Sequence, residues 1–450
     1  MDFQTFRQLA AQEAAALKIE EYELDYQMEE SASVSAFRHE IREVSDANEG
    51  GVCMRCLVDG RMGYASTQLL SEESARSLVR RAAGNAAVLE TVEPEYLVGA
   101  GQNYRSVAAS AAPLPEADAL RRAALAGQDA LYAQEGVVDG SNTEVHANRF
   151  SIAIHNSRGL DLQYENTLTF AILSPVVSDG APEEEKATGF KFALGQLDQL
   201  DLSATAKETA DEARETLGAG AAPTGVMPVV FSPKAMSYLL TFYSEVFSAE
   251  RVQKGLSLLK DKEGTAIASP IVTLVDDPFY AKNPLPMPFD AEGTPTRRKN
   301  VIENGVLTTL LYNLRTAAAA GKTTTGNAAK SNYDSVIDIQ PFTMYFASGE
   351  LTQEELLQKA QNGVLITSLD GLHAGANTIS GDFSLQSSGF LIENGQKGAP
   401  VRSFTVAGNF FDLLKNITAI ANDPQPPFFP SSTSFVSPSV LVEGLSIAGK

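Results

Sequence analysis

The sequence has 450 residues, 44% of them hydrophobic, and a formal net charge of −21 from 35 basic and 56 acidic residues. A chain of this length exceeds what one hydrophobic core organises, so we expect two domains. The acidic excess disfavours direct binding to nucleic acid or to anionic membranes. No apolar run is long enough to span a membrane, and the N-terminus lacks the basic and apolar segments of a signal peptide. With only two cysteines, this composition predicts a cytoplasmic protein.

The first half of the chain predicts helices and antiparallel strands. Residues 3–17 have apolar side chains at helical spacing, and residues 22–26 alternate as a half-buried strand does. A strand over residues 51–57 leads into an Asp59-Gly60 hairpin turn. Further helices are predicted over residues 71–89, 115–133 and 201–217, and long antiparallel strands over 137–154 and 160–177.

Residues 219–224 mark the expected boundary between an N-terminal domain, 1–220, and a C-terminal domain, 221–450. Beyond it, a short strand precedes Ser232-Pro233, an N-cap and first-turn proline for a helix through Phe247. Two identical Ile-Glu-Asn-Gly turns, at 302–305 and 392–395, predict hairpins. The remaining predicted elements are a helix over 352–360 and strands over 401–406, 417–420 and 439–447. We therefore expect the α+β class, with an N-terminal domain of helices and antiparallel strands and a C-terminal domain of mostly antiparallel strands.

The stretch over residues 371–395 is the best candidate site. It combines His373, Asn377 and an Asp382-Phe383-Ser384 triplet with five glycines. Polar side chains on a glycine-rich loop between strands favour binding, because loops carry sites and strands carry scaffold. The alternative is a surface hairpin with a polar loop.

The histidines elsewhere do not predict a metal site. His39-Glu40 begins like a zinc-protease motif, but the second histidine is missing, and the surrounding residues are typical of a strand and a polar turn. His146 and His155 lie in predicted strands, with no acidic residue at ligand spacing.

Two other patterns also fail as chemical motifs. Cys53 and Cys56 lie in a strand-like segment, where residues three apart point to opposite faces, so we interpret them as buried apolar thiols. Gly321-Lys322 resembles the end of a phosphate-binding loop, but Thr316 stands where the first glycine is needed. The residues alone predict no assembled nucleophile, zinc cluster or nucleotide loop.

Short motifs stand in order along nearly the whole chain. They are VDGR at 58–61, GYAS at 63–66, DDP at 276–278, DAEGTPTRR at 290–298, TGNA at 325–328, GDFS at 381–384, GFLIENG at 389–395, GN at 408–409 and PSVLVEGLS at 438–446. Each is weak alone. Together they resemble the TldD/PmbA family, and within it the PmbA (TldE) branch.

The resemblance implies a two-domain cytoplasmic protein of a metallopeptidase family linked to peptide processing and to modulation of DNA gyrase. It implies that TldD members bind zinc through a His-Glu-x-x-x-His helix and a cysteine near the C-terminus. They degrade unfolded peptides in a cavity between subunits, as heterodimers with PmbA-type chains. In this chain the helix after Ser232-Pro233 has no histidine, and residues 430–438 have no cysteine. We therefore expect no zinc site and no cofactor here, with zinc only in a TldD-type partner.

The favoured hypothesis is a non-catalytic subunit that completes the peptide cavity of a TldD-type partner or of a homodimer. An unfolded peptide would add as a strand to an exposed sheet edge, for which residues 381–390 are the candidate. Asp382 and Ser384 would share one face of that strand. His373, Asn377 and Asn409 complete the peptide-binding candidates.

Two alternatives stay open. The chain could be an active metallopeptidase by itself, with His373, Asp382 and Glu393 converging on a metal. It could also be a homodimer that binds peptides or a protein such as DNA gyrase. The sequence leaves open the peptide substrate and the roles of Arg297 and Arg298.

Overall fold

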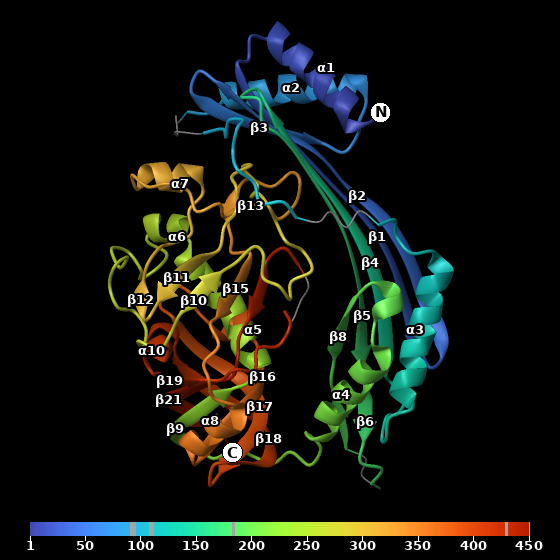
Figure 1. The fold of residues 1–450 in the computed structure, drawn as a ribbon, viewed down its shortest axis with the longest axis vertical. Coiled ribbons are helices and arrows are strands. Elements are labelled where there is room, and N and C mark those ends of the chain that lie inside the picture. Colours follow the sequence, from blue (N-terminus) through green and yellow to red (C-terminus); the bar gives the residue numbers. More distant parts are fainter. Residues whose placement is uncertain (91–95, 108–111, 182–184, 428–430, 450) are drawn as a thin grey trace.

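The computed structural model describes residues 1–90, 96–107, 112–181, 185–427 and 431–449. A long curved sheet with flanking helices, the N-lobe, stands beside a more rounded C-lobe built from residue 225 onward (Figure 1). The predicted α+β class is confirmed, and so is the strand-rich second half. Among the described residues, no helix has the length and apolar character needed to cross a membrane. The division at residues 220 and 221 stays a prediction.

The N-lobe is organised by a six-stranded antiparallel sheet in the order β3-β2-β1-β4-β5-β8. Its strands are β1 (Glu21–Phe37), β2 (Glu40–Val58), β3 (Arg61–Thr67), β4 (Asn142–Asn156), β5 (Asp161–Ser174) and β8 (Lys191–Gly195), with β6 (Val176–Ser178) and β7 (Lys186–Thr188) pairing separately. The helices are α1 (Phe3–Ala16), α2 (Glu72–Ala87), α3 (Ala117–Tyr132) and α4 (Leu202–Arg214), with a 3-10 turn at Leu197–Gln199. α1 and α2 share one apolar core at one end of the sheet, and α3 and α4 share another at the opposite end (Figure 1).

Local sequence signals explain where these elements begin and turn. Ser71 caps α2 by accepting a hydrogen bond from the backbone N–H of Ser74 at 3.1 Å, as its position before the helix predicts. The Asn304-Gly305 turn has φ angles of 48° and 83°, the left-handed pair that a two-residue hairpin requires. The Asp59-Gly60 and Asn394-Gly395 turns have the same geometry, so all three predicted hairpins are confirmed.

The C-lobe contains a ring of strands. β18 pairs with both β17 and β21, and the order β18-β17-β16-β9-β21 therefore closes on itself, with β19 also along β21. These strands are β9 (Gly225–Phe231), β16 (Gly363–Asp370), β17 (Asp382–Glu393), β18 (Gln396–Asn409), β19 (Ile417–Ile420) and β21 (Val440–Ala448). β9 and β16 are parallel and the other pairs are antiparallel.

A second C-lobe sheet has the order β12-β11-β10-β15-β20. Its strands are β10 (Leu274–Asp276), β11 (Lys299–Glu303), β12 (Val306–Leu307), β15 (Thr343–Phe346) and β20 (Ser434–Val436), and β13 (Ala328–Ala329) pairs with β14 (Asp338–Ile339). The helices are α5 (Pro233–Tyr243), a 3-10 turn at Ser244–Phe247, α6 (Ala249–Gln253), α7 (Leu314–Ala319), α8 (Gln353–Ala360), α9 (Leu372–Gly375) and α10 (Phe410–Lys415). One large apolar core joins α5 to both sheets.

The prediction that residues 381–390 form an exposed sheet edge is wrong. β17 pairs with β18 along one side, and from Gln386 onward it pairs with β16 along the other. Its first residues are covered on that second side by a bridge between Ala376 and Phe383. Because both sides are occupied, β17 offers no backbone for an added strand.

A buried ion pair joins the two lobes. Lys330 Nζ lies 2.7 Å from Asp25 Oδ2 on β1, and the two side chains are 3% and 5% exposed. Nearby, Tyr104 donates a hydrogen bond to the carbonyl of Gly293 at 2.8 Å. Phe289 packs among N-lobe side chains that include Tyr164. Polar and apolar contacts together therefore fix the position of one lobe against the other.

Removing one partner of this ion pair should destabilise the protein strongly. We expect Lys330→Met to lower the free energy of unfolding by about 3–5 kcal/mol, because Asp25 would stay buried without its counter-charge. The double variant Asp25→Asn with Lys330→Met should recover much of that loss. Urea unfolding measures both. Asp412→Asn, at the exposed ion pair with Lys415, is the control and should cost less than about 1 kcal/mol. An equally small effect of Lys330→Met would contradict the role assigned to the pair.

Candidate functional site

A large cavity lies between the two lobes and has a volume of about 1050 Å³. The N-lobe lines it with β8 and α4, and the C-lobe lines it with the first turn of α5, with β16 and with the start of α8. Its lining includes Phe190, Lys191, Phe192, Asp201, Glu212, Glu215, Ser232, Lys234, Ser237, Glu354, Thr367, Asp370, Phe390, Lys397 and Asp423. Because each lobe supplies only one wall, the cavity exists only when the lobes are held together.

Lys234 lies on the cavity wall that α5 forms. It follows the N-cap Ser232 and Pro233 at the start of α5, and its ammonium lies 4.3 Å from the ring centre of Phe190 on the opposite lobe. Burial lowers the pKa of Lys234, while the carboxylates of Glu212 and Asp370 act in the opposite direction. A partly desolvated cation beside an aromatic face suits the recognition of an anionic or carbonyl group.

Two further cations of the cavity, Lys191 and Lys397, pair with carboxylates. Lys191 Nζ lies 2.8 Å from both Glu208 and Glu212. Although burial opposes it, these two hydrogen bonds raise the pKa of Lys191. Lys397 pairs with Glu215 at 2.7 Å and lies 4.0 Å above the ring of Phe390. The walls therefore combine alternating charges with aromatic faces, which suits a flexible polar ligand such as a peptide better than an apolar one.

Nothing in the cavity forms a catalytic set of the familiar kinds. Its lining has serine hydroxyls and carboxylates but no histidine or cysteine. Ser232 uses its hydroxyl to cap α5, accepting from the N–H of Ala235 at 3.3 Å. Over the described ranges, no three His, Cys, Asp or Glu side chains are grouped closely enough to hold a metal ion. The geometry can bind and orient a ligand, and it shows no activated nucleophile.

Part of the predicted site does come together. Asn409 donates to Asp382 Oδ1 at 2.9 Å, and this bond, with Ser380, lowers the pKa of Asp382. Asn409 also caps α10, and Asn377 accepts from the N–H of Ile379 at 2.9 Å. Both asparagines therefore use their side chains to shape the loop.

The remaining predicted residues lie on exposed surface. Asp382 and Ser384 alternate with buried Phe383, so the prediction that they share a face is confirmed. His373 is exposed on α9. The large cavity is not lined by any of the five candidates His373, Asn377, Asp382, Ser384 and Asn409. Their role in binding peptide stays a prediction.

The alternative metal set of His373, Asp382 and Glu393 is wrong. Asp382 and Glu393 are the first and last residues of the single strand β17. A strand rises about 3.3 Å per residue, so these carboxylates lie roughly 36 Å apart along it. They cannot meet at one ion.

The other histidines and both cysteines lie as the sequence predicts. His39 is in the turn between β1 and β2 and contacts Asp129 at 2.9 Å, while His146 and His155 lie on β4. Cys53 and Cys56 are buried in β2, and burial raises the pKa of both thiols, that of Cys56 to about 11. Both are therefore unreactive at neutral pH.

The DAEGTPTRR motif supports the junction between the lobes. Asp290 accepts three backbone hydrogen bonds, from Glu292, Thr294 and Ala328. Gly293 has a φ of 77°, and a Cβ there would meet Leu160 of the N-lobe at 2.4 Å. The neighbouring arginines are exposed: Arg297 donates to the carbonyl of Thr324, and Arg298 lies 3.9 Å from Asp277.

Asp290 and Glu292 have perturbed carboxyls and are not among the residues that line this cavity. Burial raises the pKa of Asp290, and burial with the charge of Asp290 raises that of Glu292 to about 8, although Arg55 opposes this. Perturbed carboxyls often mark active sites. These two are enclosed at the packed junction and do not line the large cavity, so we assign them to the junction.

Glu292 should make stability depend on pH. Its pKa is raised above the ordinary value of 4.5, so the folded state holds the proton longer than the unfolded state, and stability falls as pH rises from about 4.5 to 8. Glu292→Gln should flatten the fall of the unfolding free energy between pH 5 and 8. The exposed Glu443→Gln is the control and should keep it. The measurement is urea unfolding across that range, and an unchanged slope in Glu292→Gln would contradict this assignment.

The cavity residues were not found from the sequence. Lys191, Lys234 and Asp370 come from three elements far apart in the chain, so no local spacing links them. One signal was present: Lys234 is the single charged residue in the helix Pro233–Tyr243. A lone charge in an otherwise apolar helix marks a position that meets something polar.

Comparison with known proteins finds one family whose models match most of the chain. Three family models match: PmbA/TldA metallopeptidase domain 1 over residues 22–86, its central domain over 110–217, and its C-terminal domain over 224–449. A Haemophilus influenzae protein named metalloprotease PmbA homolog is 26% identical over 426 residues, covering 93% of this chain and 90% of that protein.

Two solved structures share the fold. A Thermotoga maritima protein, named as a proposed modulator of a DNA gyrase, is 30% identical, with a TM-score of 0.88 over 99% of this chain and 100% of that one. TldE from Thermococcus kodakarensis is 23% identical, with a TM-score of 0.85 over 99% of both chains. The likeness extends over both lobes.

Proposed function

Because the chain belongs to the PmbA/TldD metallopeptidase family, as a PmbA/TldE-type protein, we propose that it is a non-catalytic subunit that holds unfolded peptides for a TldD-type partner. One observation carries this proposal. The first turn of α5 lines a cavity of about 1050 Å³, while α5 itself has no histidine. The helix therefore borders a binding cavity and offers it no histidine.

The residues present do not fit zinc. Active members of the family, by the resemblance above, need two histidines and a glutamate on one helix. The helix Pro233–Tyr243 supplies Lys234, Ser237, Thr241 and otherwise apolar or aromatic residues. Serine, threonine and lysine are poor zinc ligands at neutral pH. The segment 430–438 has no cysteine, and its residue 430 lies outside the described part. We therefore assign no hydrolytic step to this chain.

The cavity suits a peptide in size and chemistry. Its volume of about 1050 Å³ is slightly above the range for small-molecule sites, which is about 300–1000 Å³. Lys234 offers a cation to carbonyl or carboxylate oxygens, and Asp370 offers an acceptor to backbone or side-chain N–H groups. Phe190 and Phe390 offer faces to apolar side chains. Such mixed walls would bind peptides of many different sequences.

The partner would supply the chemistry. By the resemblance, a TldD-type chain brings the zinc, and this chain would hold the peptide in the cavity between its own lobes, beside that partner. The acidic surface favours protein and peptide contacts over nucleic acid. Peptide binding here uses the cavity between the lobes, since β17 cannot accept an added strand.

Zinc content and cleavage of a disordered peptide test this proposal. We expect the purified chain to hold substoichiometric zinc and to leave the peptide intact. Adding a TldD-type chain should yield a complex with chelator-sensitive cleavage. Stoichiometric zinc and chelator-sensitive cleavage by this chain alone would overturn the proposal.

Lys234 should contribute to peptide affinity within that complex. We expect Lys234→Met to raise KM about tenfold and to leave kcat nearly unchanged, because it removes a charge-assisted hydrogen bond from binding and not from the reaction. Lys415→Met, on exposed α10, is the control and should change neither. Equal KM values for the two variants would contradict a role for the cavity in binding.

A further inference from the structure

One long strand edge of the N-lobe is open. β2 pairs with β1 along its whole length, but it pairs with β3 only from Val52 to Val58. Across the described ranges, no strand or bridge pairs with the outer side of residues 40–50. This stretch is roughly 35 Å long at about 3.3 Å per residue. It lies at the outer margin of the sheet (Figure 1), and only its last residue, Gly50, comes near the C-lobe, because a Cβ on the next residue, Gly51, would lie 2.7 Å from the ring of Tyr333.

We propose that the edge formed by residues 40–50 is a docking site at which an extended, basic segment of a partner protein adds to the sheet as a strand. Edges of this length present a row of unpaired N–H and C=O groups, and proteins usually shorten, cover or bulge them. Strand addition satisfies those groups with the backbone of the partner.

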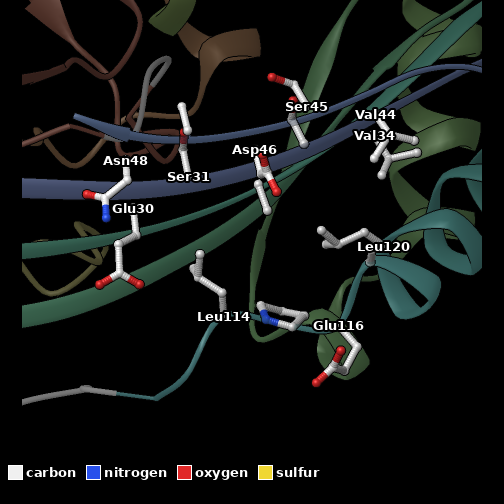
Figure 2. Close-up of a pocket in the computed structure, with 15 residues that line it drawn as sticks. Glu30, Ser31, Val34, Val44, Ser45, Asp46, Asn48, Leu114, Glu116 and Leu120 are labelled. Atoms are coloured by element: carbon white, nitrogen blue, oxygen red, sulfur yellow. The ribbon is translucent and has the colours of Figure 1, made fainter.

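A hollow beside the edge gives the added strand a place for side chains. Its volume is about 530 Å³, and β1, β2 and residues 114–120 line it (Figure 2). Val34 and Val44 lie beside Leu120 at one end, with Leu114 nearby. Val44 is 44% exposed, which is high for its size. A strand along β2 would cover these side chains with apolar residues at alternate positions.

Charge complementarity selects a basic partner over a second copy of this chain. The edge carries four carboxylates and one cation: Glu40, Glu43, Asp46, Glu49 and Arg42. The hollow adds Glu30 and Glu116. Glu29 stands directly opposite Glu49, and burial together with the charge of Glu49 raises the pKa of Glu29. Lysine or arginine from a partner would relieve this repulsion, whereas a second copy would add to it.

Peptide binding in the cavity and docking at this edge are independent. The cavity lies between α4 and α5, and the edge lies on the far margin of β2 (Figure 1). A partner docked at the edge would therefore leave the cavity accessible.

Fluorescence anisotropy with labelled model peptides tests the docking site on the full chain. The probe is a nine-residue peptide that alternates lysine and valine. We expect it to bind, and we expect binding to weaken at least tenfold when alternate backbone amides are methylated, because each methyl group removes an edge hydrogen bond. A peptide that alternates glutamate and valine should bind at least tenfold more weakly than the lysine probe.

Charge reversal on the edge identifies the site. Glu43→Lys with Asp46→Lys should weaken the lysine probe about tenfold and strengthen the glutamate peptide. Glu303→Lys with Glu443→Lys makes the same change of net charge on exposed C-lobe positions and should leave both affinities unchanged.

Backbone variants separate docking from folding. The N–H groups of adjacent residues in a strand point to opposite sides of that strand. Val44→Pro and Ser45→Pro are therefore a matched pair: one variant removes an N–H that faces β1, and the other removes an N–H that faces outward. The variant that removes the outward N–H should keep the thermal unfolding midpoint of the unchanged protein and should no longer bind the lysine probe.

Three results would overturn the proposal. The first is no binding of the lysine probe. The second is an affinity for the probe that neither methylation of the peptide nor charge reversal on the edge changes. The third is a dimer of this chain, seen by sedimentation, that the outward proline variant dissociates, because the edge would then belong to a second copy.

Discussion

The buried ion pair between Asp25 and Lys330 joins the two lobes. Lys330 follows β13 of the C-lobe and reaches Asp25 on β1, within a region that also contains the Glu23–Arg55 pair and Glu292. Charges this deeply buried are costly unless each is paired, so the two lobes have one favourable arrangement. The apolar contacts of Phe289 and the enclosed loop around Gly293 lie at the same junction and also stabilise this arrangement of the lobes.

The cavity depends on that junction. Its walls are α4 and β8 on one lobe and α5 and β16 on the other, so a change in the angle between the lobes would open or close it. Within it, Lys234 faces Phe190 across the gap, and the carboxylates nearby act on its charge. We propose that a site of this kind, with binding groups and no metal ligands on α5, divides the work between two subunits: this chain holds the peptide and a TldD-type chain cleaves it.

Local features were predictable from the sequence, and long-range ones were not. The Ser71 cap, the three Asn-Gly or Asp-Gly turns and the shared face of Asp382 and Ser384 each depend on residues within a few positions of one another. The closure of the ring depends on β18 meeting β21, and no pattern in β17 indicates that both of its sides are occupied. The cavity likewise joins elements far apart in the chain. The sequence predicts a site at the polar loop around Asn377 because that loop is rich in polar side chains, and in the structure these side chains shape its turns.

Photo-crosslinking from inside the cavity tests the central claim most directly. A photoreactive residue would replace Thr367, on the cavity wall, or Ser384, on the exposed face of β17, in the complex with a TldD-type chain and a labelled disordered peptide. We expect the peptide to crosslink to position 367 and not to position 384. Crosslinking at position 384 without any at position 367 would contradict peptide binding in the cavity and would place the peptide beside the polar loop of residues 371–395.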